Sequence, residues 1–170
     1  MVTSTFDATY SVYKLTSAID QLLFSGFGGV EITSVHSDGQ ITADQLIGTI
    51  SEVKTSSSLD KVLRSRAVVD ARPGSKITVE VTLEMPDGGS TVANLMVKAP
   101  RFGRGGIVKI RGGREDWYIR NPGSFERILR ALSGGEHYDD LVVSGPGRKQ
   151  VQQQPVVVDG KAFFRIRIVR

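Results

Sequence analysis

Two histidines, His36 and His137, are the side chains best suited to acid-base or metal chemistry in this sequence of 170 residues, which contains no cysteine. The first precedes a serine and an aspartate, but a hydrolytic triad is assembled from separate elements and cannot form between neighbours on one turn. The second lies near Asp139 and Asp140, residues suited to acid-base catalysis that more often belong to a solvated loop. Neither histidine has the spacing of a metal ligand. The sequence therefore predicts no metal site, and an enzyme using the His137 cluster is only the third hypothesis.

Glycine-rich segments that could cradle a phosphate group fail on their context. Residues 26–29 read Gly-Phe-Gly-Gly, yet they follow a predicted helix and precede a predicted strand, the reverse of a dinucleotide-binding turn. Gly160 and Lys161 lack the upstream glycine and the following Ser or Thr of a phosphate-binding loop. No catalytic residue, cofactor or small-molecule ligand is predicted.

Arginines interleaved with glycines and aromatic residues occupy residues 101–118. Such side chains neutralise phosphates and stack on unpaired bases, and Arg and Trp also anchor protein interfaces. Three apolar residues between 107 and 110 predict a strand inside this segment, which makes the glycines candidates for turns. Partner contact and nucleic-acid contact are both kept as hypotheses. The candidate contact residues are Arg101, Phe102, Arg104, Arg111, Arg114, Trp117 and Tyr118.

The charge is distributed unevenly along the chain. Residues 1–97 carry 7 basic and 11 acidic side chains, whereas residues 98–170 carry 15 basic and 7 acidic ones. Opposite charges on two halves are typical of domains that pack together, and a basic half also suits nucleic acid or an anionic surface. With 39% hydrophobic and 24% charged residues the chain has the composition of a folded globular protein. No signal peptide and no membrane span are expected, and the compartment stays open.

The candidate contact residues must be positioned by helices and strands. In the first 100 residues the predicted elements are mainly strands. Apolar spacing predicts a helix over 13–24. The clearest strand is 76–85, where every second residue is apolar, and 86–89 then form a turn to a hairpin partner at 90–98. Further strands are predicted at 30–35, 46–54 and 62–70, with a turn at 37–39 and a polar loop at 55–58.

Beyond residue 100 the pattern becomes α+β. A helix over 124–132 has Ser124 as its N-cap and ends at a glycine pair. Short strands are predicted at 106–110 and 141–143, with a mobile polar loop at 145–155. Residues 162–169 alternate apolar and basic side chains, which predicts a closing strand with one buried face.

Together these patterns predict a mainly β chain in three parts. Residues 1–29 form an N-terminal segment of strand and helix, 30–99 an antiparallel β-sandwich of immunoglobulin-like (Ig-like) character, and 101–170 a small α+β unit with a basic surface. Short strands with turn signals every ten or so residues carry the sandwich prediction.

The segment 70–83, followed by 97–100, resembles the unit of bacterial Ig-like modules in which Pro-Gly precedes alternating Val and Thr. From about Leu22 to Arg170 the chain resembles the region that trails the peptidase-like domain in bacterial proteins of the sporulation stage IV protein B serine peptidase type. The shared order comprises a helix before residue 30, the Ig-like unit, the helix at 124–132, the strand at 140–143 and the alternating last strand.

This resemblance implies a non-catalytic region of a larger, exported bacterial protein, because the glycine- and serine-rich catalytic segment and the histidine of that family have no counterpart here. The expected function is therefore an accessory or interaction region that contacts a protein partner or a neighbouring domain. Nucleic-acid binding through residues 101–118 and the basic last strand is the alternative.

Overall fold

The computed structural model describes residues 8–29, 31–36, 46–113, 124–133 and 136–169. Strands far outweigh helices among the described residues, which confirms the predicted mainly β class. The chain divides into two compact units. The first comprises Met1–Gln45 and Arg114–Tyr138, and the second comprises Leu46–Gly113 and Asp139–Arg170.

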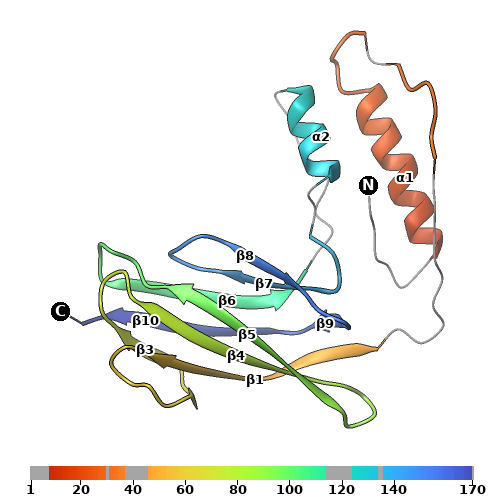
Figure 1. The fold of residues 1–170 in the computed structure, drawn as a ribbon. Coiled ribbons are helices and arrows are strands. Elements are labelled where there is room, and N and C mark those ends of the chain that lie inside the picture. The colour runs from red at the N-terminus through yellow and green to blue at the C-terminus, as the bar shows by residue number, and fades with distance from the viewer. Residues whose placement is uncertain (1–7, 30, 37–45, 114–123, 134–135, 170) are drawn as a thin grey trace. The chain divides into compact units, whose positions relative to one another are not determined.

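The second unit is a sandwich of two five-stranded sheets, which confirms the predicted sandwich (Figure 1). Sheet A has the strand order β2-β1-β4-β5, and β9 pairs with the start of β1, on the edge away from β4. Its strands are β1 (Ile47–Ser57), β2 (Arg64–Ser65), β4 (Lys76–Glu84), β5 (Ser90–Lys98) and β9 (Val157–Asp159).

Sheet B has the strand order β3-β10-β6-β7-β8. Among the described residues six of the eight strand pairings are antiparallel, and the pairs β1 with β9 and β3 with β10 are parallel. The strands of this sheet are β3 (Val68–Ala71), β6 (Gly105–Gly112), β7 (Asp140–Ser144), β8 (Gln150–Gln153) and β10 (Lys161–Ile168).

One hydrophobic core fills the space between the sheets. The alternation predicted for residues 76–85 is confirmed, because β4 buries every second side chain completely. Sheet B supplies the facing half of the core from β3, β6, β7 and β10. Each fully buried aliphatic side chain contributes about 1.5–3 kcal/mol. The largest fully buried side chains of this core are Ile77, Leu83, Ile110, Leu141 and Ile166.

The structure divides the chain differently from the predicted boundary at residue 100. Strands from both sides of Pro100 lie in each sheet, since β9 pairs with β1 and β10 pairs with β3. The segments 46–99 and 101–113 therefore share one core, whereas the residues between 114 and 138 belong to the helical unit. Periodicity identifies which side chains are buried, but it carries no information about which strand will cover them.

The chain crosses from sheet A to sheet B at a sharp turn between β9 and β10. The last residue of β9, Asp159, is separated from the first residue of β10 by Gly160 alone. Gly160 has a φ of 89°, a conformation that L side chains rarely adopt, and its amide donates to Asp159 Oδ1 at 2.6 Å. This corner connects the two layers of the sandwich covalently.

Three local predictions are wrong. Residues 31–36 form no strand. The polar residues 55–57 continue β1, because Thr55 and Ser57 pair with Val79 and Ile77 and turn their side chains into the unit, where both are buried. The segment 145–155 contains β8, which pairs with β7. Short polar side chains favour loops locally, but pairing with a long neighbouring strand overrides that preference.

The described residues of the first unit form two helices, α1 (Ala8–Leu23) and α2 (Phe125–Ser133), which confirms both helix predictions. The Ser124 cap is also found, since the Arg127 amide lies 3.4 Å from Ser124 Oγ and donates to its carbonyl at 3.2 Å. Phe27 packs edge-on against Phe125, with ring centroids 6.5 Å apart. In the described part of the chain no helix has the length and apolar content needed to cross a membrane.

Candidate functional site

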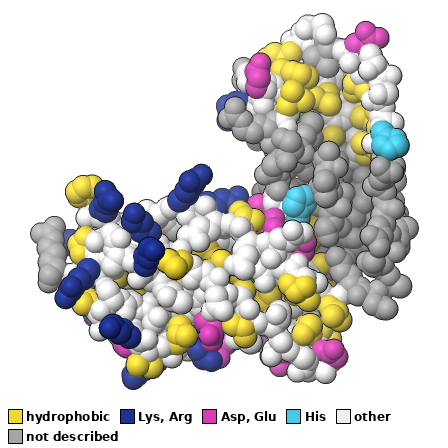
Figure 2. Space-filling view, in the orientation of Figure 1, with side chains coloured by type: hydrophobic (Ala, Val, Ile, Leu, Met, Phe, Trp, Pro, Cys, Tyr) yellow, Lys and Arg dark blue, Asp and Glu magenta, His cyan; other side chains and the backbone are white. Residues whose placement is uncertain are grey.

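Positive charge is concentrated toward one end of the sandwich. In Figure 2 the Lys and Arg side chains gather at the left, the end at which Figure 1 shows β10 finishing and β6 beginning. The loops that connect strands at this end carry Arg72, Arg101, Arg104, Arg148 and Lys149. The turn between β4 and β5, at the other end, carries Asp87 instead.

The predicted contact residues that the structure describes do not form one surface. Arg101, Phe102 and Arg104 are exposed and precede β6, whereas Arg111 is half-buried near the end of that strand. At about 3.4 Å per residue, Arg104 and Arg111 are about 24 Å apart along β6. The other three predicted contacts, Arg114, Trp117 and Tyr118, lie outside the described residues.

The outer side of sheet B carries a set of side chains that we call the basic face. Successive side chains of a strand point to opposite sides of the sheet. Val69, Val108 and Phe164 point into the core, so the residues next to them in sequence point outward. The basic face comprises Val68 and Asp70 from β3, Lys161, Phe163, Arg165 and Arg167 from β10, and Ile107, Lys109 and Arg111 from β6.

Strand register mixes apolar and basic side chains within this face. Arg165 lies between Val68 on one neighbouring strand and Ile107 on the other, and Phe163 is opposite Lys109. Phe163 is 54% exposed and Ile107 is 58% exposed. The Lys109 ammonium is 5.9 Å from the centre of the Phe163 ring, within range of a cation–π interaction. The face therefore offers apolar contact area beside Arg165 and Lys109.

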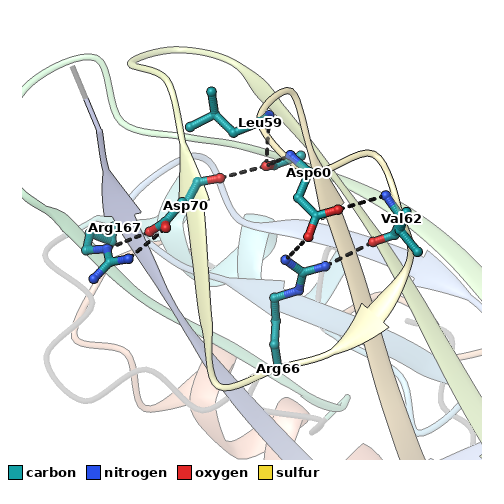
Figure 3. Close-up of polar contacts among 7 residues, drawn as sticks. Leu59, Asp60, Val62, Arg66, Asp70 and Arg167 are labelled. Atoms are coloured by element: carbon teal, nitrogen blue, oxygen red, sulfur yellow. Dashed lines mark hydrogen bonds and ion pairs between the residues drawn. The ribbon is translucent and has the colours of Figure 1, made fainter.

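The basic face contains one carboxylate, that of Asp70, and this group is hydrogen-bonded to Arg167 on the same face. Arg167 donates from Nε to Asp70 Oδ1 at 2.5 Å and from Nη2 to Oδ2 at 2.7 Å, as Figure 3 shows. These bonds lower the pKa of Asp70 and raise the pKa of Arg167. On the same residue, the Asp70 carbonyl accepts a bond from the Ser57 hydroxyl at 2.6 Å, which ties β3 to β1.

The remaining cations leave the basic face with an excess of positive charge. Arg111 donates from Nη1 to the Gly112 carbonyl at 2.7 Å, which holds its guanidinium close to the strand. Across the ranges that the structure describes, Lys161 and Arg165 make no ion pair, so both present their charge to solvent. An anionic or mixed acidic and apolar surface would complement this face.

The outer side of sheet A is balanced by comparison. Lys54 lies 3.1 Å from a Glu52 carboxylate oxygen and 3.8 Å from one of Glu80. The hydrogen bond to Glu52 is the main cause of a raised Lys54 pKa. The charge asymmetry between the two halves of the sequence thus corresponds in part to a difference between the two sheets.

Of the two histidine clusters, the structure describes His36, the half-buried His137, Asp139 and Asp140. His36 is exposed, and the Asp139 carboxylate accepts a bond from Gln153 Nε2 at 2.8 Å. Asp140 begins β7 and is buried. In the described part of the chain no three or more His, Asp or Glu side chains form a group that could hold a metal ion.

Sequence reasoning recognised that the last strand is basic but missed Lys109, Ile107 and the pairing of Asp70 with Arg167. The alternation in residues 161–168 signals that Phe163 and Arg165 share one side of a strand. No signal in the sequence gives the register that brings Asp70 beside Arg167, since the two residues are 97 positions apart.

No family model, curated protein or solved structure matches this chain. The resemblance to the sporulation peptidase type therefore stays a prediction.

Proposed function

We propose that this chain is a non-catalytic interaction region that binds a partner protein, or a neighbouring domain of a longer chain, through the basic face. The mixture of cations with exposed Phe163, Ile107 and Val68 on three hydrogen-bonded strands is the observation that carries the proposal. The Ig-like character of the sandwich and its place in a larger exported bacterial protein belong to the same proposal, and they rest on the sequence resemblance.

A protein partner suits this face because binding energy at protein interfaces comes mainly from aromatic and Arg side chains in a desolvated centre. Phe163 and Arg165 are adjacent outward positions on β10, the middle strand of the three. Since the strands already hold their backbone in place, binding would order few additional groups. The expected partner surface is acidic with an apolar centre.

The test compares affinity capture by the full chain with capture by two variants. Arg165→Glu combined with Phe163→Ala removes the centre of the basic face, and Lys54→Glu on sheet A is a charge-reversed control. The proposal expects one or more captured proteins to be lost with the double variant and retained with the control. Equal capture by the double variant and the native chain would refute the basic face as the binding surface.

Nucleic-acid binding is the second candidate, because the exposed Phe163 ring lies beside Lys109. Single-stranded nucleic acid is bound by aromatic rings that stack on bases next to cations that neutralise phosphates. Fluorescence anisotropy with short single-stranded RNA and DNA tests this function. If this chain binds nucleic acid through the basic face, its binding should weaken as salt rises. Phe163→Ala should weaken the binding by roughly 5- to 150-fold, the equivalent of about 1–3 kcal/mol per stacked base. No binding below about 100 μM would eliminate it, since even non-specific binding reaches that range.

A further inference from the structure

The end of the sandwich opposite the β4–β5 turn is built from four loops, which we call the basic end. They comprise residues 58–63, 72–75, 99–104 and 145–149. Backbone bonds join the second loop to the third, from Gly74 N to Pro100 O at 3.2 Å and from Ala99 N to Ser75 O at 2.9 Å. The Ile168 amide donates to the Arg104 carbonyl at 3.2 Å, so the third loop is also attached to the end of β10.

The charge of this end is almost entirely positive. Its loops carry six cations and one carboxylate, that of Asp60. The carboxylate is already satisfied, because Asp60 Oδ1 accepts from the Val62 amide at 3.1 Å and Oδ2 accepts from Arg66 Nη1 at 2.8 Å (Figure 3). These bonds, the Val62 amide first, lower the pKa of Asp60. The six cations are Lys61, Arg72, Arg101, Arg104, Arg148 and Lys149.

Large apolar side chains project from the same loops. Phe102 is 88% exposed and lies between Arg101 and Arg104 in sequence. Leu59, Val62 and Leu63 are exposed in the first loop. The first loop is held in place, since Ser57 Oγ accepts from the amides of Leu59 at 3.2 Å and Asp60 at 3.3 Å. An ordered loop that exposes three aliphatic side chains to water loses free energy unless another surface covers them.

We propose that the basic end docks on the surface of an anionic lipid bilayer. Phe102 and the aliphatic side chains of the first loop would enter the boundary between headgroups and acyl chains, and the surrounding cations would contact lipid phosphates. Positive charge beside exposed apolar tips is the combination that such a surface selects, because acyl chains cover the tips and phosphates attract the charge. This site is separate from the basic face, since the two share no residue.

A nucleic acid fits this end less well than lipid. Bases stack on aromatic rings, and three of the four projecting apolar side chains are aliphatic. A bilayer accepts aliphatic and aromatic side chains alike. Membrane contact at loop tips also needs no groove, only loops that finish at one end of a rigid scaffold.

The test is sedimentation of the full chain with vesicles of phosphatidylcholine alone and of phosphatidylcholine mixed with phosphatidylglycerol. The proposal expects binding to the anionic vesicles only, and weaker binding as salt rises. Arg104→Gln should weaken it about fivefold, the effect of one cation near an anionic surface. Lys54→Gln on sheet A is the matched control and should leave it unchanged. For the apolar tip, Phe102→Asp should abolish binding, whereas Val92→Asp on the exposed side of β5 should not.

Insertion is measured independently with Phe102→Trp. Its emission should shift to shorter wavelength with anionic vesicles and be quenched by brominated acyl chains, relative to the native chain with its one tryptophan. The proposal is overturned if anionic vesicles do not bind, if neutral vesicles bind equally, or if Phe102→Trp shows no shift. If the native chain captures its partner but does not bind anionic vesicles, this inference alone is refuted, since Arg165→Glu and Phe163→Ala test the basic face separately.

Discussion

The contact between Gly112 and β9 provides a stringent test of how the sandwich closes. An added Cβ on this residue would lie 1.9 Å from the Val158 carbonyl oxygen, whereas real Cβ atoms essentially never approach another atom within 3.0 Å. Replacing Gly112 with alanine therefore requires β6 and β9 to separate by about 1 Å. Neither strand is free to move, because β9 pairs with β1 and Val158 is buried in the core.

The expected loss of stability follows from that geometry. Overpacking a protein interior costs about 1–3 kcal/mol, and a clash with backbone rather than with a flexible side chain falls at the upper end. Separation would also break the bond from the Gly112 amide to the Gly160 carbonyl, which is 3.4 Å long. We expect Gly112→Ala to lower the free energy of unfolding by about 3 kcal/mol.

Urea unfolding followed by far-ultraviolet circular dichroism measures this change. With a slope of about 2 kcal/mol per molar urea, the midpoint should fall by about 1–2 M. Gly28→Ala is the control, since an added Cβ there meets nothing within 4 Å, and it should change stability by less than about 0.5 kcal/mol. If Gly112→Ala costs no more than the control, β9 does not lie against β6 and the account of the closed core fails.

Three further predictions concern the core and its polar connections. Leu83→Ala should lower the free energy of unfolding by about 2–5 kcal/mol, because the side chain is fully buried; a urea titration showing under 1 kcal/mol would contradict this burial. Ser57→Ala should cost about 1–3 kcal/mol by leaving the Asp70 carbonyl without its hydroxyl donor, and thermal unfolding compared with the exposed Ser58→Ala checks it. The Asp70–Arg167 pair should contribute little coupling free energy in a double-mutant cycle, since both side chains are largely exposed to solvent, which screens their attraction. Because the folded-state pKa of Asp70 is lowered, the contribution should be complete above the unfolded pKa of about 3.9 and disappear as the pH falls through the lower folded value; a cycle energy independent of pH down to about 2 would contradict that cause.

The elements that the sequence predicted well are those whose own side chains reveal their environment. The strand around Val79 and Val81 alternates strictly, and the helix after Ser124 has a cap, so local chemistry was sufficient. The polar residues Thr55 and Ser57 were assigned to a loop because their burial depends on β4 and β3, which lie elsewhere in the sequence. Local preference and long-range pairing disagreed there, and pairing determined the structure.

The residues of the candidate site could likewise be predicted only in part, since local sequence identifies the side chains but not how they are grouped. Exposed Arg and Phe residues could be identified from composition, but their grouping depends on strand register. Arg101 and Arg111 are predicted to belong to one contact surface, although β6 separates them along its length. Phe163 and Lys109 became neighbours only through the antiparallel pairing of β10 with β6. Register between distant strands is a property of the whole fold, and neither charge nor spacing along the chain encodes it.

The position of β10 has a consequence for synthesis of the protein in the cell. This strand is the last one described, yet it fills the middle of sheet B between β3 and β6. While residues 161–168 are still inside the ribosome, β3 and β6 of the nascent chain have no partner along the edges that β10 will occupy. Contacts that span nearly a hundred residues slow folding, and unpaired edges invite association with other chains. The sandwich is therefore expected to close only once β10 has left the ribosome, with chaperone protection of β3 and β6 until then.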